Sequence, residues 1–291
     1  MTLYDIVLAP FADYGFMRRA LVACVALGLG AGPVGVLLML RRMSLMGDAL
    51  SHAILPGAAI GFLIAGGFSL PIMGLGGLVA GLAVALGAGF VSRMTKVKED
   101  ASFATFYLTS LAAGVLIVSA RGSNVDLLHV LFGSILAIDT PALLLVAGIA
   151  SVTLVVLALI YRPLVIECFD PGFLRAVGGG GPVFHVAFLA LVVLNLVAGF
   201  EALGTLMAVG LMMLPATVAH LWTNRLGVMM AIASGTAMVS GFAGLVISFH
   251  LETASGPTII LVASSLYLLS LLLGPAGLLH RLIPKKAHLQ G

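Results

Sequence analysis

The chain has 291 residues, of which 61% are hydrophobic and only 9% are charged, and its formal net charge is +3. About a quarter of the residues of a soluble domain are charged, so this composition excludes an aqueous fold and predicts an all-α, polytopic integral membrane protein. The basic residues are scattered through short segments, which argues against a nucleic-acid partner and is typical of residues that set orientation in a lipid bilayer. Almost nothing is left over for a soluble part, so residues 1–291 are predicted to form a single transmembrane domain.

Apolar segments predict where the chain crosses the bilayer, because about 20 apolar residues span its core as a helix. The uncharged segments of suitable length are, in chain order, 20–40, 53–92, 101–120, 140–161, 182–200, 202–219, 226–249 and 253–279. Since 53–92 is long enough for two crossings joined by a turn at 68–74, we expect about eight to nine transmembrane helices. A shorter apolar piece at 127–138 is predicted to be re-entrant or interfacial. Helix breaks are expected around Pro56 and Pro215, where neighbouring protein or water would satisfy the freed carbonyls.

The basic residues also predict the orientation. An N-terminus outside and a C-terminus in the cytoplasm places every lysine and arginine except Arg18, Arg19 and Arg121 at the inner face, as the positive-inside rule requires. An acidic outer mouth results, which would raise the local concentration of cations; ordinary loop acids are an equal alternative. The acids at this face are Asp5, Asp13, Asp126, Asp139, Glu201 and Glu252.

Two pairs of glycines have the GxxxG spacing that lets helix backbones approach closely in lipid. They are Gly57 with Gly61 and Gly77 with Gly81. We expect these pairs to pack helices within the chain, with a subunit interface as the alternative.

Asp48 and His52 are the strongest candidates for a functional site. Ionisable side chains in a membrane segment cost on the order of 3 kcal/mol and are therefore functional candidates. Four residues apart on a helix, the two side chains lie on one face, where a carboxylate oxygen and an imidazole nitrogen can bind one Zn²⁺ or Mn²⁺ ion. Two ligands are too few for tight binding, and a twofold dimer would supply two such pairs. The alternative is structural: Asp48, close after Arg41 and Arg42, caps the helix start, and His52 hydrogen-bonds to it.

Other ionisable residues give weaker signals. Glu201 lies between two apolar segments, and His250 and Glu252 lie at the outer end of a crossing. These three are candidate residues of a cation pathway, with solvated loop residues as the alternative. His185 has no convincing partner in the sequence, and the same holds for His129, His280 and His288.

Motifs that would indicate catalysis are absent from the sequence. There is no G-x-x-x-x-G-K-[ST] loop for ATP and no H-E-x-x-H motif of a zinc protease. Ser51 and His52 are adjacent, so on a helix they point about 100° apart and do not form a nucleophile–base pair. The chain is therefore not predicted to be an enzyme.

Several segments, taken in order, resemble the permeases of bacterial zinc and manganese ABC importers. RRMSLMGDALSHAILPGAAIGF, at 41–62, is similar to the second-helix signature of that family. The further matches are LLHVLFGSILAID (127–139), YRPLVIECFDPGFLRAVG (161–178), ALGTLMAVGLMMLPATVAHLW (202–222) and SGPTIILVAS (255–264). Together they cover nearly the whole chain and look closest to the zinc-type members from Gram-negative bacteria.

The resemblance implies a homodimeric pore in the bacterial plasma (inner) membrane. It also implies two copies of a separate cytoplasmic ATP-binding subunit, which would hydrolyse the ATP, and an extracytoplasmic metal-binding protein. Asp48 and His52 match the intramembrane metal ligands of the family. Glu252 is a departure, because the family often has Asp before its S/T-G-P motif, and this puts in doubt any role borrowed for that acid.

The resemblance further implies contacts with the ATP-binding subunit. The segment 214–227 is expected to turn at the inner face, where Arg225 would touch that subunit. The segment 167–175, with Asp170 and Arg175, is a second candidate contact.

The sequence thus predicts the permease subunit of an ATP-driven importer of a divalent transition metal, zinc first and manganese next. No cofactor is expected to stay bound, because the metal is the cargo. One alternative is an ion-coupled secondary transporter, although such proteins often show two related halves and no clear internal repeat is visible. The other is an ABC permease for a metal chelate, which would not need a carboxylate–imidazole pair.

Overall fold

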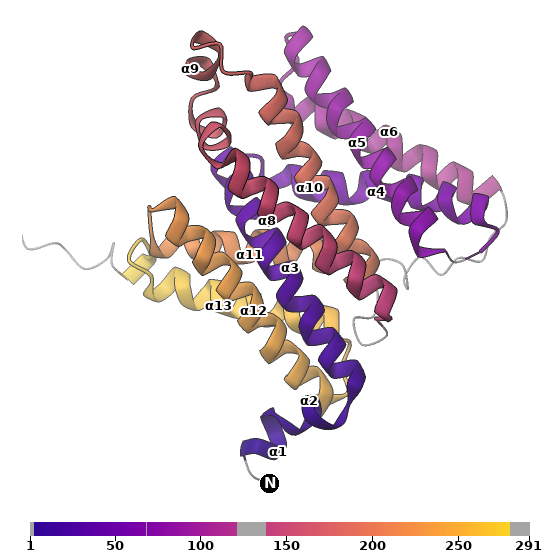
Figure 1. Ribbon diagram of the computed structural model, residues 1–291, viewed down its shortest axis with the longest axis vertical. Coiled ribbons are helices and arrows are strands. Elements are labelled where there is room, and N and C mark those ends of the chain that lie inside the picture. The colour runs from indigo at the N-terminus through magenta and orange to yellow at the C-terminus, as the bar shows by residue number, and fades with distance from the viewer. Residues whose placement is uncertain (1–2, 68, 121–137, 280–291) are drawn as a thin grey trace, which may run out of the picture.

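The computed structural model describes residues 3–67, 69–120 and 138–279, and within these ranges the regular secondary structure is helical throughout (Figure 1). The long helices are α3 (Gly15–Leu40), α4 (Ser44–Ala65), α5 (Leu70–Met94), α6 (Glu99–Ala120), α8 (Thr140–Phe169), α10 (Gly181–Leu203), α11 (Thr205–Trp222), α12 (Leu226–Leu251) and α13 (Ser255–Leu273). Three short helices complete the described chain: α1 (Leu3–Val7), α2 (Ala9–Asp13) and α9 (Pro171–Ala176).

The helices confirm an all-α polytopic membrane protein. In the described ranges, 8 helices are long and apolar enough to cross a membrane, and α11 adds a shorter apolar helix over Met207–Trp222. Helices are required here because lipid offers no partner for backbone N–H and C=O groups. The second crossing begins at Ser44 rather than near residue 53, and α8 continues past residue 161 to Phe169.

The breaks expected at two prolines are not found. Helix α4 runs through Pro56 and α11 runs through Pro215 without interruption. The chain is interrupted instead at Gly204, between α10 and α11, where φ is 85° and ψ is 164°. Glycine adopts such a positive φ without steric cost. The segment expected to be re-entrant, 127–138, lies outside the described residues except for its last residue.

Close glycine contacts join α4 to its neighbours. A Cβ added at Gly57 would meet the Gly76 carbonyl oxygen of α5, and a Cβ at Gly61 would lie 2.6 Å from the Ile72 carbonyl oxygen. On α5, a Cβ at Gly77 would lie 2.7 Å from Ile54 of α4. These backbones therefore approach closely only because the residues lack side chains, which confirms packing within the chain for the GxxxG pairs.

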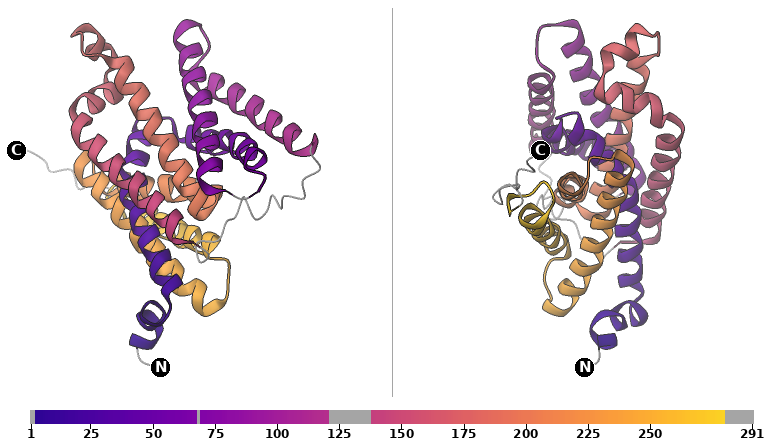
Figure 2. Two further views of the ribbon diagram at one scale, coloured as in Figure 1. Left: turned by 45° about the vertical axis from the view of Figure 1, so that its right-hand side comes forward. Right: turned by 90° about the vertical axis from the view of Figure 1, so that its left-hand side faces the viewer.

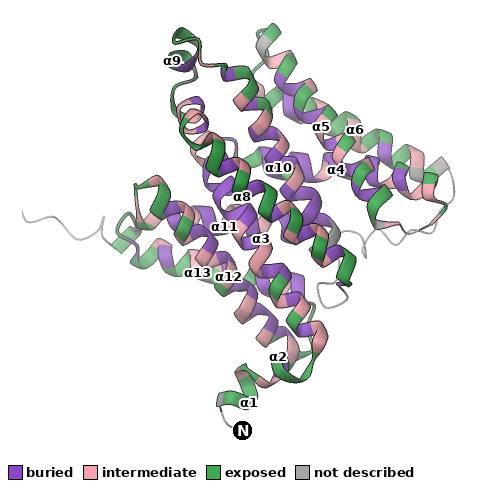
Figure 3. Ribbon diagram, in the orientation of Figure 1, coloured by how far each residue is buried: buried purple, intermediate pink, exposed green. Residues whose placement is uncertain are grey.

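The helices form two groups around a shared centre (Figures 1 and 2). Helices α4, α5 and α6 pack on one another on one side, and α12 packs on α13 on the other. Helices α3, α10 and α11 connect the groups, since α10 packs on α5 and α4 while α11 packs on α3, α12 and α13. Buried residues concentrate along these central helices (Figure 3).

Candidate metal site

Asp48 and His52 lie on one face of α4, as their spacing predicts. The His52 Nε2 and Asp48 Oδ1 atoms are 3.8 Å apart, and the two side chains are 34% and 66% exposed. This separation is too long for a hydrogen bond. Two ligand atoms each about 2.1 Å from a metal ion can lie no more than about 4.2 Å apart, so the observed separation allows both to bind one ion.

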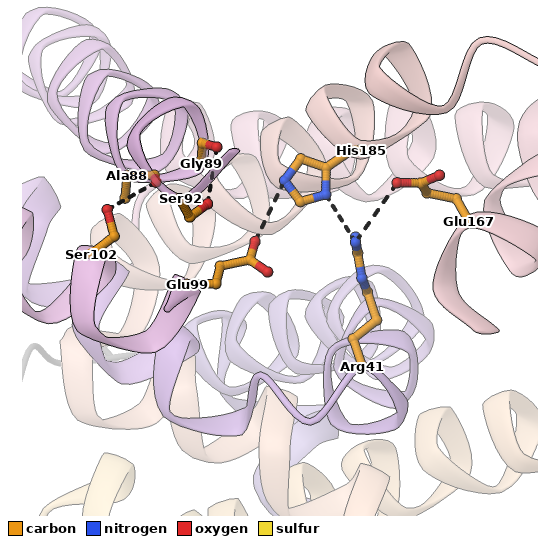
Figure 4. A network of polar contacts seen from close by, with 8 residues as sticks. All are labelled: Arg41, Ala88, Gly89, Ser92, Glu99, Ser102, Glu167 and His185. Atoms are coloured by element: carbon orange, nitrogen blue, oxygen red, sulfur yellow. Dashed lines mark hydrogen bonds and ion pairs between the residues drawn. The ribbon is translucent and has the colours of Figure 1, made fainter. Parts of the chain in front are cut away.

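The structural alternative for Asp48 is wrong. Helix α4 begins at Ser44 after Met43, and no side chain forms a capping hydrogen bond there. Asp48 is in the second turn, too far along the helix to bond the first backbone N–H groups. The side chain of Arg41, close before Asp48 in sequence, is directed to His185 and Glu167 instead (Figure 4).

Asp48 and His52, the candidate metal pair, lie on the exposed face of α4. Leu45, three positions before Asp48 and therefore on the same side of the helix, is 84% exposed. The opposite face, including Leu50 and Ile54, is buried against the rest of the chain. Among the described residues no group of three or more His, Cys, Asp or Glu side chains could hold a metal ion. The described part of one chain therefore offers two ligands at an exposed face, which is an incomplete site.

The candidate pathway residues do not join this pair into one cluster. His250 Nε2 lies 2.7 Å from the Ile6 carbonyl oxygen, so one ring nitrogen is used to hold α1 against the end of α12. Glu252 is exposed and ends α12 in the left-handed conformation, with φ at 52°. Glu201 lies in the last turn of α10, and its side chain is outside the described part of the structure.

The candidate contacts for an ATP-binding subunit lie at helix junctions. Asp170 ends α8, and its Oδ1 accepts a hydrogen bond of 2.9 Å from the Phe173 backbone N–H, so it caps α9. Arg175 is in α9, and its side chain is not among those described. Arg225 is exposed directly before α12. Exposure at a junction leaves Asp170 and Arg225 accessible to a partner.

A buried polar network lies beside the start of α4 and was not found from the sequence (Figure 4). Arg41 Nη2 is 2.9 Å from His185 Nδ1 and 4.0 Å from Glu167 Oε1. On the other side of the ring, His185 Nε2 is 3.7 Å from Glu99 Oε1. The guanidinium also lies over the Phe188 ring, 5.2 Å from its centroid, in the range of a cation–π contact.

The network joins four helices at their ends. Arg41 directly follows α3, and Glu99 is the first residue of α6. Glu167 lies in the last turn of α8, and His185 is in the second turn of α10. His185 therefore does have partners, contrary to the sequence-based expectation. The only signal available in the sequence was a charge next to an apolar segment, which is also typical of solvated helix ends.

Comparisons with known proteins show the family of the chain. The sequence model of the ABC 3 transport family matches residues 13–274. The chain is 37% identical over 264 residues to the manganese transport system membrane protein MntC of Halalkalibacterium halodurans, an alignment that covers 90% of this chain and 89% of the relative. It is 31% identical over 270 residues to the chelated iron transport system membrane protein YfeD of Yersinia pestis, covering 93% of this chain and 89% of the relative.

A solved structure has the same arrangement of helices. PsaBC from Streptococcus pneumoniae, solved in complex with Fab, superposes with a TM-score of 0.82 at 29% sequence identity. The superposition covers 94% of this chain and 97% of the matched chain. The similarity therefore extends over nearly the full length of both chains.

Proposed function

The chain belongs to the ABC 3 transport family, and we propose that it is the membrane-spanning permease subunit of an importer that moves manganese ions into the cytoplasm. Zinc is the second candidate cargo. The sequence alone favoured zinc, whereas relatives such as the one from Halalkalibacterium halodurans are named for manganese. Oxygen and nitrogen ligands suit both metals, so the relatives rather than the ligands support this order.

The observation that carries the proposal is the Asp48–His52 pair on the exposed face of α4. An ion held by one pair would keep most of its coordination positions open. A second copy of the chain related by a twofold axis would bring the same pair to the same place and complete four ligands. We therefore propose a homodimer, with the metal passing between the two α4 helices. The metal is cargo in this mechanism, and no cofactor is needed by the permease.

The orientation of the chain is part of the proposal. With the N-terminus outside, the charged helix ends near Arg41 and the junctions at Asp170, Arg175 and Arg225 face the cytoplasm. Two copies of a separate ATP-binding subunit would dock on these junctions and hydrolyse the ATP. An extracytoplasmic metal-binding protein would deliver the ion to the opposite, acidic face in the plasma membrane of a bacterium.

Each step can be assigned to residues of this chain. At the outer face, the carboxylates of Glu201 and Glu252 would raise the local concentration of the cation. Asp48 and His52 would replace part of its hydration shell, because a carboxylate and an imidazole can substitute for water oxygens. ATP-driven movement of the two subunits would then expose the Asp48 and His52 side chains to the cytoplasm and release the ion.

His52→Ala tests the metal pair. We expect manganese uptake by membranes containing the complete importer to be abolished at limiting metal, while the amount of assembled dimer is unchanged because the ring is partly exposed. His220→Ala, at an exposed histidine near the end of α11, is the matched control and should keep uptake. Normal uptake by the His52→Ala importer would contradict the ligand role.

A chelate permease is the second candidate, favoured by the similarity to the chelated iron transport protein of Yersinia pestis. Uptake of manganese, zinc and a chelated iron complex at matched concentrations separates the two, since only free ions require the Asp48–His52 pair. Co-purification tests the alternative of a secondary transporter, because only an ABC permease should retain an ATP-binding subunit.

A further inference from the structure

Arg41 occupies an unusual place for an arginine next to an apolar helix. Its side chain is 9% exposed, and that of Glu167 is 4% exposed. The guanidinium reaches α8 through Glu167 and α10 through His185 and Phe188. A snorkelling arginine would instead extend its charge to the membrane surface. The side chain therefore connects helices inside the protein.

The two ends of this connection lead to the two functional regions of the proposed permease. Glu167 lies three positions before Asp170, which caps α9 at a proposed contact with the ATP-binding subunit. Arg41 lies in the turn between α3 and α4, and Asp48 follows in the second turn of α4. The ion pair between Arg41 and Glu167 is thus a short physical path from the proposed ATPase contact to the metal pair.

The turn that carries Arg41 is tight, so a movement of the side chain would be passed to α4. The Arg41 N–H donates to the Leu37 carbonyl, and the Met43 N–H donates to the Leu38 carbonyl at 3.1 Å. Arg42 between them has φ at 59°. A non-glycine residue in this conformation costs about 1–3 kcal/mol and persists only where the surroundings hold it in place.

The Arg41–Glu167 contact leaves room for a second arrangement. Guanidinium–carboxylate pairs usually close at about 2.7–2.9 Å, whereas Arg41 Nη2 and Glu167 Oε1 are 4.0 Å apart. In the described part of the chain, Arg41 Nη1 is buried and has no hydrogen-bond acceptor. A shift of the end of α8 toward the turn would give this donor a carboxylate oxygen.

We propose that Arg41 is a positioning residue that couples movement of the α8–α9 junction to the metal-binding helix α4. When the ATP-binding subunit displaces this junction, Glu167 closes on Arg41, and the α3–α4 turn moves the Asp48–His52 pair. This inference rests on the proposed function, because it requires an ATP-binding subunit at α9 and a metal site on α4.

The test uses the complete importer in lipid vesicles and a cysteine probe on α4. Leu45→Cys places a thiol on the exposed face that carries Asp48, and its rate of maleimide labelling is measured with and without ATP and vanadate. The chain without the added cysteine gives the background from Cys168. We expect the labelling rate to change about tenfold with nucleotide, as for a typical coupling free energy. In Arg41→Met/Glu167→Gln the change should fall below about twofold.

The double variant separates coupling from folding, because it removes one positive and one negative charge from the interior together. Arg162→Met is the matched control: it removes the same charge from an exposed residue of α8 outside the network and should keep the nucleotide response. ATP hydrolysis by the double variant should continue, with fewer manganese ions imported per ATP. A nucleotide response equal to that of the unsubstituted chain, or no response in that chain, would overturn the inference. The manganese proposal can fail separately. In that case the unsubstituted importer would show no manganese uptake, while its labelling response to nucleotide would remain.

Discussion

Two polar regions lie on either side of the α3–α4 turn and differ in almost every physical respect. The Asp48–His52 side chains are 66% and 34% exposed, whereas the Arg41–Glu167 side chains are 9% and 4% exposed. The first region lies at the surface of one chain, and in the proposed mechanism a second copy of the chain supplies the remaining metal ligands. The second joins four helices within the chain. We therefore expect the exposed charges to be substituted without loss of the fold, and the buried charges to be needed for it.

The largest effect is expected from removing one charge of the buried region. Arg41→Met removes the cation that lies beside the buried Glu167 carboxylate, and breaking a buried ion pair in this way costs about 3–5 kcal/mol. We expect a lower midpoint of thermal unfolding in detergent and less protein in the membrane. Adding Glu167→Gln should recover most of the loss. An unchanged midpoint for the single variant would show that the network is not a structural element.

Asp48→Asn should lower transport and leave stability unchanged, the opposite of Arg41→Met. Substituting residues that only orient a metal ligand costs about 10–100-fold in metal affinity or activity. Losing Asp48, which binds the ion directly in the proposed mechanism, should therefore lower manganese uptake at least about 100-fold. The unfolding midpoint should be unchanged because the carboxylate is exposed. Asp100→Asn, at an exposed acid in the first turn of α6, is the control. A large loss of stability in Asp48→Asn would remove the contrast between the two regions.

Gly57→Ala tests the buried face of α4, opposite the metal pair. The added Cβ would meet the backbone of Gly76, which does not move aside as a side chain does, so we expect a loss of about 1–3 kcal/mol in stability. Gly148→Ala in α8 is the control, because nothing lies within 4 Å of a Cβ there. Uptake per assembled dimer should be nearly unchanged. A selective loss of uptake would mean that α4 packing also sets the geometry of the metal pair.

Thr153→Val asks whether a neutral buried hydrogen bond contributes as much as the charged network. Asn195 Nδ2 of α10 donates to Thr153 Oγ1 of α8 at 2.8 Å and also to the Leu191 carbonyl. Because the amide keeps its second acceptor, we expect a loss of only about 0.6 kcal/mol, the average for such bonds in membranes. Thermal unfolding measures the difference, with Thr105→Val at an exposed position as the control. A loss as large as that of Arg41→Met would place the main interhelical contact of α8 at Asn195.

Much of the fold could be predicted from the sequence because lipid imposes a simple rule. Every long apolar segment has to become a helix that satisfies its own backbone, and the helix count and class follow from segment lengths. Asp48 and His52 could be placed on one face because the helical period alone determines their relative direction. The ends were less accurate: α4 begins at Ser44, well before the apolar segment, because hydropathy does not register a helix that continues through polar residues.

The sequence by itself determined the class of the protein, its helices and the candidate metal pair, because each depends on local composition or on the helical repeat. Only the tertiary structure decided that Pro56 lies within an unbroken helix and that Arg41 turns away from Asp48. It alone brought His185 to Arg41, which is 144 positions away in the chain. Contacts between distant helix ends depend on how the helices pack, and no local pattern of residues records that arrangement.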